Sequence, residues 1–129
     1  MSNAIKKQIM ASSQSDFELT GEAAGEQVFR FSEAFLGFEG HFPGRPVLPA
    51  IVQLLIAQCV AEAVEKKSMQ LLAVPKAKFL SVLGPDQEIV VRCRKIASKQ
   101  NQRFDISLHS GDVMAASIVM EGGFGNDRE

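Results

Sequence analysis

Hydrophobic residues in the middle of the chain follow a helical pattern that has almost no polar face. The run begins at Pro49, whose missing N–H costs no hydrogen bond in the first turn of a helix. It continues with few polar interruptions, and the pattern predicts one long helix that ends at Lys67. Because a helix that is apolar nearly all round must be covered on most sides, we expect it at the centre of the fold.

After this helix the pattern changes to an alternation with a period of two, which is typical of strands. The segment around Gly25, before the helix, also contains two short strand-like pieces. A bend or a bulge is expected at Pro75, because proline cannot donate to a strand ladder. The strands predicted after the helix cover 71–83, 88–97, 103–110 and 113–124, with turns at 84–86, 98–101 and 110–112.

This order predicts an α+β fold with a single hot-dog domain, in which one antiparallel β-sheet of about five or six strands wraps around one long central helix. We expect residues 16–125 to form the domain, with a polar, flexible tail at 1–15 and a short C-terminal tail at 126–129. One sheet around one helix leaves a sheet edge open, so a homodimer or a higher oligomer of dimers is expected.

Composition narrows the function further. The chain has 129 residues, 46% hydrophobic and 22% charged, with a formal net charge of -1, so a basic nucleic-acid or membrane surface is not expected. No signal peptide is visible at the start. Two cysteines, Cys59 and Cys93, are too few for a disulfide framework or a zinc site and are expected as small buried hydrophobes in a cytoplasmic protein.

One stretch carries specific chemistry. "GHFPGRPVLPAIVQL" at 40–54 closely resembles the active-site segment G-H-F-P-G-x-P-V-x-P-G of the β-hydroxyacyl-(acyl-carrier-protein) dehydratases (FabZ/FabA-like) of the hot-dog superfamily. The "PVLP" and "VQL" spelling is especially similar to the dehydratases attached to aryl-polyene clusters. "AKFLSVLGPDQEIVVRCR" resembles the strand, turn and strand that follow the helix in this family.

The resemblance implies that a 3-hydroxyacyl chain on a carrier-protein phosphopantetheine arm loses water to give a trans-2-enoyl thioester, without metal or organic cofactor. It implies that His41 takes the C2 proton, a role that suits a neutral imidazole. The peptide N–H of Ala50, where the family usually has Gly, would polarise the thioester carbonyl. The implied substrate-binding residues are Phe42, Pro43, Gly44, Pro49, Ala50, Leu55 and Gln58.

The pattern departs from the family at one catalytic position. The family places a Glu or Asp fourteen residues after the histidine, and this chain has Leu55 there. Leucine cannot protonate a departing hydroxyl, and a positioned acid is worth on the order of 10²- to 10⁴-fold in rate. Possible substitutes are Gln58 through a water, Glu62 roughly 10 Å further along the axis, Glu39, or an acid from a partner chain, since this family draws its histidine and acid from different subunits.

Other residues have two interpretations each. Phe35, Phe38 and Phe42 either line an acyl tunnel or belong to the core. Arg45 either meets a carrier-protein phosphate or points into solvent. His109 ends a strand on its polar face and is expected to be structural.

Two functions therefore stay open. The first is a dehydratase-like protein of fatty-acid or polyene-type synthesis that acts on acyl thioesters with His41 as base and an unassigned or missing acid. The alternative is a non-catalytic subunit that binds an acyl thioester or acyl carrier protein and pairs with a catalytic homologue. Thioester hydrolysis is a third, but that chemistry commonly needs a carboxylate on this helix, so Leu55 counts against it equally. The expected partners are acyl carrier protein or an acyl-CoA thioester.

Overall fold

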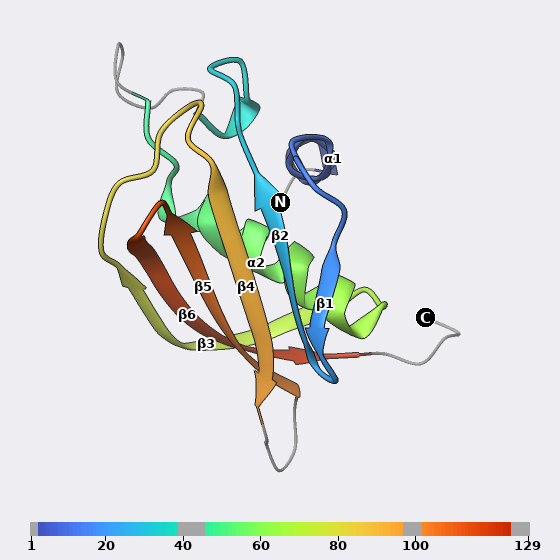
Figure 1. Cartoon of the computed structure of the whole chain (residues 1–129). Coiled ribbons are helices and arrows are strands. Elements are labelled where there is room, and N and C mark those ends of the chain that lie inside the picture. Colours follow the sequence, from blue (N-terminus) through green and yellow to red (C-terminus); the bar gives the residue numbers. More distant parts are fainter. Residues whose placement is uncertain (1–2, 39–45, 97–101, 125–129) are drawn as a thin grey trace.

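The computed structural model describes residues 3–38, 46–96 and 102–124. Its chain begins with a helix, enters a sheet, crosses to a central helix and returns to the sheet (Figure 1). The elements are α1 (Asn3–Ala11), β1 (Glu18–Gly21), β2 (Ala24–Phe29), the 3-10 helix η1 (Leu36–Phe38), α2 (Ala50–Glu65), β3 (Gln70–Phe79), β4 (Ile89–Ile96), β5 (Gln102–Ser110) and β6 (Val113–Gly123).

The strands form one six-stranded sheet in the order β1-β2-β4-β5-β6-β3, and all neighbouring strands are antiparallel. The sheet curls around α2, with β1 and β3 at its two edges (Figure 1). This confirms the expected α+β architecture, a hot-dog domain with an antiparallel sheet wrapped around one long helix.

The alternation along the strands separates an inner face, toward α2, from an outer face. On β5, Phe104, Ile106 and Leu108 are fully buried, as the period-two pattern predicted. On β4, Cys93 is buried while its neighbour Arg92 is exposed. The inner face therefore supplies one wall of the core, and α2 supplies the other.

The central helix begins where proline predicted it and ends two residues earlier than expected. Pro49 has extended backbone (ψ 155°) and caps α2 without a side-chain hydrogen bond. Lys66 adopts the left-handed conformation with φ 60°, and its N–H donates to the carbonyl of Glu62. This turn closes the helix after Glu65, so Lys66 and Lys67 lie beyond it.

The expectation of a flexible N-terminal tail is wrong for the part of it that the structure describes. Residues 3–11 form α1, and its Ile9 is fully buried in the core cluster. Ile5, one helical turn earlier, packs against the same cluster, so the two isoleucines form an apolar stripe within a polar sequence. The chain then runs beside β2, where the N–H of Gln14 donates to the carbonyl of Val28 at 2.7 Å.

The structure corrects one local prediction and confirms another. The turn between β1 and β2 lies at residues 22–23, so Gly25 lies inside β2 and not between two strands. A Cβ at this glycine would come within 2.2 Å of the Phe17 ring, which explains why the strand needs glycine there. The irregularity expected at Pro75 is confirmed as a shift of register, because the pairing of β3 with β6 slips between Ala73 and Lys76.

Other predictions concern parts outside the described residues. These are the turn at 98–101 and the C-terminal tail at 126–129, while the domain boundary at 16–125 stays a prediction. Within the described ranges, no helix is both long enough and apolar enough to cross a membrane.

Candidate functional site

Part of the histidine motif lies outside the described residues. This part includes the predicted base His41 and its predicted substrate-binding neighbours Phe42, Pro43 and Gly44, together with Glu39 and Arg45. The described part of the motif starts at Pro46 and leads into α2, so the site is built here from the helix that carries its second half.

The entry to α2 is fixed by two hydrogen bonds on one residue. The N–H of Leu48 donates to the carbonyl of Leu83 at 2.7 Å, and the Leu48 carbonyl accepts from Gln53 Nε2 at 3.1 Å. Gln53 is only 3% exposed, and its buried Oε1 has no hydrogen-bond partner among the described residues. A buried polar side chain thus holds the backbone immediately before Pro49 in place.

The first turn of α2 presents backbone donors. The N–H groups of Val52 and Gln53 both donate to the Pro49 carbonyl at 3.1 Å. No described group accepts a hydrogen bond from the N–H of Ala50 or Ile51, and both residues are exposed. Since the helix macrodipole is positive at this end, these N–H groups favour an oxygen that gains negative charge, and the role of Ala50 as a donor to the thioester carbonyl stays a prediction.

Leu55 lies one turn further along the helix, at the position where the family pattern has an acid. Its side chain is 8% exposed and belongs to the hydrophobic core cluster. The two described phenylalanines with an open role, Phe35 and Phe38, are also in this cluster. Their ring centroids lie 5.6 Å apart in an edge-to-face arrangement, which is ordinary core packing.

The polar side chains on the second half of α2 hold neighbouring elements. Gln58 Nε2 donates to the Met69 carbonyl at 2.9 Å, and Glu62 Oε2 accepts from the Met69 N–H at 2.7 Å. Glu62 Oε1 also accepts from Lys6 Nζ at 3.3 Å, which ties α1 to α2. Together, Gln58 and Glu62 bind both backbone groups of the residue before β3.

The remaining carboxylate of α2 is paired as well. Glu65 forms an ion pair with Lys95 of β4 at 2.5 Å. Both carboxylates of the helix are therefore engaged with cations or backbone donors of this chain, and neither is poised beside Leu55 as a proton donor.

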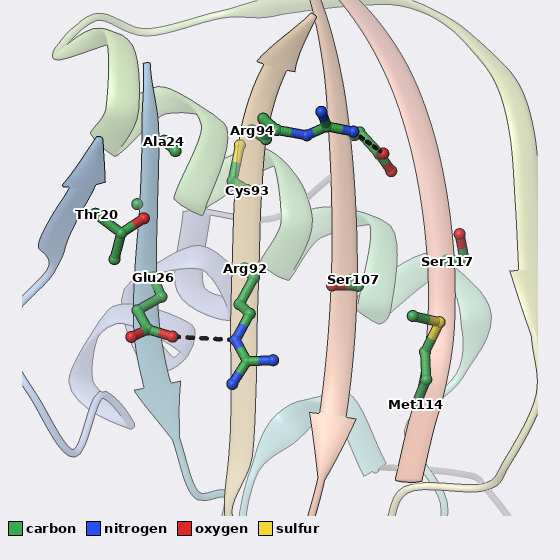
Figure 2. Close-up of a pocket in the computed structure, with 11 residues that line it drawn as sticks. Thr20, Ala24, Glu26, Arg92, Cys93, Arg94, Ser107, Met114 and Ser117 are labelled. Carbon is green, nitrogen blue, oxygen red and sulfur yellow. Dashed lines mark hydrogen bonds and ion pairs between the residues drawn. The ribbon is translucent and has the colours of Figure 1, made fainter. Parts of the chain in front are cut away.

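A groove with a volume of about 530 Å³ lies on the outer face of the sheet, on the side away from α2 (Figure 2). Its charged side chains neutralise each other: Glu26 pairs with Arg92 at 3.2 Å, and Arg94 with Asp105 at 3.0 Å. Among the predicted site residues that the structure describes, none lines this groove. Its charged side chains form surface ion pairs with one another, and the candidate site stays at the start of α2.

The other titratable groups that the sequence singled out are structural in their surroundings. Burial raises the pKa of Cys59 to about 11 and that of Cys93 to about 12, so both thiols stay protonated and buried, as expected. Burial, followed by the nearby Arg92, lowers the pKa of His109, whose Nε2 lies 2.8 Å from the Ser107 hydroxyl. In the ranges that the structure covers, no group of three His, Cys, Asp or Glu side chains can hold a metal ion.

Sequence reasoning missed the role of Gln53. This glutamine is one of the few polar residues in the apolar run, and its hydrogen bond to the Leu48 carbonyl links the helix to the residue before Pro49. The available signal was a glutamine four residues after the proline that starts the helix, on a face that is otherwise apolar.

The chain is similar in sequence to known dehydratases. The model of the ApeI-like family, described as ApeI dehydratase, matches residues 18–118. The 3-hydroxyacyl-[acyl-carrier-protein] dehydratase FabZ of Paramagnetospirillum magneticum is 27% identical over 61% of this chain and 53% of its own length. The FabZ of Desulfotalea psychrophila is 32% identical over 62% of this chain and 58% of its own length. The chain thus spans between half and three fifths of the length of these two relatives.

A solved structure agrees on the fold. The dehydratase heterocomplex ApeI:P from Xenorhabdus doucetiae contains a chain that superposes with a TM-score of 0.72 at 18% identity, covering 86% of this chain and 96% of that one. Similarity at this identity establishes the shared fold.

Proposed function

The chain belongs to the ApeI-like dehydratase family, and from that premise we propose that it takes part in dehydrating 3-hydroxyacyl thioesters as one half of a paired hot-dog enzyme. In this proposal the chain contributes the base and the carbonyl-binding backbone, and a homologous partner contributes the acid. The acyl group arrives as a thioester of acyl carrier protein or coenzyme A.

The chemistry divides between two ends of the substrate. His41 removes the C2 proton, and the thioester carbonyl gains negative charge as the C2–H bond breaks. The N–H groups of Ala50 and Ile51 at the positive end of α2 are suited to stabilise that oxygen. The C3 hydroxyl then leaves as water, which requires one proton from an acid.

A single observation supports the pairing: α2 has no carboxylate available for that last step. Leu55 stands at the acid position, while Glu62 and Glu65 are bound to Lys6, Met69 and Lys95. The family resemblance implies that histidine and acid come from different subunits. A homologue with an acid at its equivalent of Leu55 therefore completes one site with His41, whereas a homodimer of this chain has two sites without that acid.

The open side of the fold supports a partner of the same kind. α2 packs mainly against β2, β4 and β5, and most residues of the edge strand β3 are exposed. Apolar side chains remain exposed there and just beyond, with Phe79 at 41%, Leu80 at 58% and Val82 at 75% exposure. A second hot-dog subunit can bury this surface and extend the sheet at β3.

Turnover of a 3-hydroxyacyl thioester tests the missing acid. We expect background turnover from the purified chain and a gain on the order of 10²-fold or more in Leu55→Glu. Leu55→Gln is the matched control, because it has nearly the same size and polarity but cannot give up a proton. Adding His41→Ala to Leu55→Glu is expected to abolish the gain.

The other outcomes contradict the proposal in distinct ways. Turnover by the parent chain that His41→Ala abolishes would place a working acid within the chain itself. A folded Leu55→Glu variant, checked by circular dichroism, that stays inactive would support the non-catalytic binding subunit instead.

A further inference from the structure

The two edges of the sheet carry opposite charge. The segment 66–83, which contains the edge strand β3, has four lysines and no acid, whereas the segment 16–22, which contains β1, has three acids and no Lys or Arg. The lysines are Lys66, Lys67, Lys76 and Lys78, and the acids are Asp16, Glu18 and Glu22. Any strand that extends the sheet beyond β3 therefore meets a basic edge.

Two of the lysines stand on the strand itself and on its outer face. Lys76 and Lys78 pair with Val119 and Ser117 of β6, while Ala77 between them pairs with the buried Ile118. Both lysines are exposed, and neither has an ion-pair partner in the part of the chain that the structure describes. Their charge is available to an incoming strand.

The regular part of β3 is short and contains both lysines. The register against β6 shifts on either side of Ala73 and becomes continuous only from Lys76 to Phe79. Pro75 cannot donate a backbone hydrogen bond, so it does not help to pair a new strand. An added antiparallel strand is therefore expected to pair along 76–79.

A second copy of this chain is a poor partner for this edge. In a two-fold antiparallel pair, the numbers of opposing residues have a constant sum. Any register centred on residues 76 to 78 consequently places a lysine of one copy opposite a lysine of the other. Like charges directly opposite each other destabilise a pair of strands, whereas opposite charges stabilise it.

The acidic edge of a second copy does not match β3 either. β1 has four residues and an irregular register at Leu19, against ten residues in β3. The partner must also cover the exposed apolar side chains of Phe79, Leu80 and Val82, which calls for a strand edge backed by an apolar face.

We propose that the β3 edge selects a non-identical hot-dog subunit whose own edge strand carries acidic residues, in preference to a second copy of this chain. This inference rests on the proposed function, which needs a homologous partner, and names the charge by which that partner is recognised. Lys76 and Lys78 are then specificity determinants: they act on the choice of partner and leave the chemistry of the site untouched.

The chain itself can supply the probe. The variant Lys76→Glu/Lys78→Glu is a hot-dog subunit with an acidic edge, and both substitutions are at exposed positions. Mixed with an equal amount of the parent chain and measured by native mass spectrometry, it should give roughly ten mixed dimers for each homodimer of either kind, whereas random pairing gives about as many homodimers in total as mixed dimers. Raising the salt concentration should reduce that excess, because the opposing charges are exposed and screened.

A matched control reverses two lysines away from the regular part of the edge. Lys7→Glu/Lys67→Glu makes the same change in net charge at exposed positions of α1 and of the turn before β3. Mixed with the parent chain, it should give the binomial proportion of dimers. Lys78→Glu alone should give a smaller excess than the double variant and serves if the double variant folds poorly.

Three results would overturn the proposal. The binomial proportion in the parent–variant mixture would show that the lysines do not select, and the absence of dimers in every mixture would show that the edge does not pair. Open-ended oligomers of the parent chain would indicate pairing of β3 with the acidic β1 of another copy. Because the readout is mass, each of these results is independent of turnover by Leu55→Glu.

Discussion

The two ends of α2 use their polar side chains for different purposes. At the C-terminal end, Gln58 and Glu62 bind both backbone groups of Met69, and Glu62 also binds Lys6. At the N-terminal end, Gln53 makes one hydrogen bond to the residue before Pro49, and its buried Oε1 has no hydrogen-bond partner in the part of the chain that the structure describes. The polar side chains at the C-terminal end thus form hydrogen bonds and an ion pair within the chain. At the N-terminal end, the Oε1 of Gln53 can still accept a hydrogen bond.

This difference indicates which end of α2 can bind a ligand, since the rest of the helix packs in the core. The C-terminal polar groups position β3 and α1, so they are committed to the fold. The first-turn N–H groups of Ala50 and Ile51 are exposed and without a described acceptor. A ligand oxygen is the natural partner for donors at this end, whereas an acid on the same helix would have to replace Leu55.

The largest loss of stability is expected from a charge placed at the buried N-terminal end of α2. Gln53→Glu replaces the donor to the Leu48 carbonyl with a carboxyl in a position that is 3% exposed. A buried charge without a partner costs about 3 to 5 kcal/mol, so the free energy of unfolding should fall by that amount at neutral pH. Urea denaturation monitored by circular dichroism measures it.

The pH dependence of this variant has a defined sign. Burial raises the pKa of the new carboxyl in the folded state, and its neutral form can donate to the Leu48 carbonyl. The variant should therefore be most stable below the ordinary glutamic acid pKa of about 4.3, and it should lose stability as pH rises above it. Gln58→Glu, at a half-buried position, should lose less; an equal loss would remove the contrast between the two ends.

A smaller effect is expected at the C-terminal end. Glu62→Ala leaves the Met69 N–H without its acceptor and removes the ion pair with Lys6. An unsatisfied buried donor costs about 1 to 3 kcal/mol, so unfolding should become easier by that amount. Glu62→Gln keeps an oxygen for Met69 and should recover most of the loss in the same urea titration. If Gln were as costly as Ala, the charge rather than the hydrogen bond would anchor this end.

Much of the fold followed from periodicity because burial alone decides it. The helix start at Pro49 and the inner face of β5 were predicted correctly, since both depend on local backbone rules or on alternating hydrophobicity. The N-terminal helix was missed because only Ile5 and Ile9 mark its buried stripe among polar residues. This helix is stabilised by its packing on the core, and that packing cannot be predicted from the local sequence pattern.

The candidate site was predictable to a different extent. Counting from His41 predicted that Leu55 replaces the acid of the family pattern, and the structure shows that Leu55 lies on α2 and that α2 starts at Ala50. The roles of both residues in a site stay predictions. The hydrogen bonds of Gln53 and Glu62 could not be read from the sequence, because their partners Leu48 and Met69 are positioned by the turns at the helix ends. Those bonds are tertiary facts that spacing alone does not determine.

The smallest expected effect is a change in the rate at which Cys59 is alkylated, which measures local opening near the C-terminal end of α2. Burial raises the pKa of Cys59 from 9.0 to about 11, with a smaller opposing effect of Lys6 and a raising effect of Glu62. At pH 8 the thiolate fraction of the folded chain is then about 100-fold below that of an exposed cysteine, so alkylation by iodoacetamide must proceed mainly through local opening.

Loss of the Glu62 contacts should make that opening easier. In Glu62→Ala, alkylation of Cys59 should accelerate about fivefold relative to the parent, while Cys93, on β4 at 2% exposure, should change less. Peptide mass spectrometry after timed labelling separates the two cysteines. Equal acceleration at both cysteines would mean that the whole domain opens at once. The two ends of α2 would then differ in their contacts but not in their local stability.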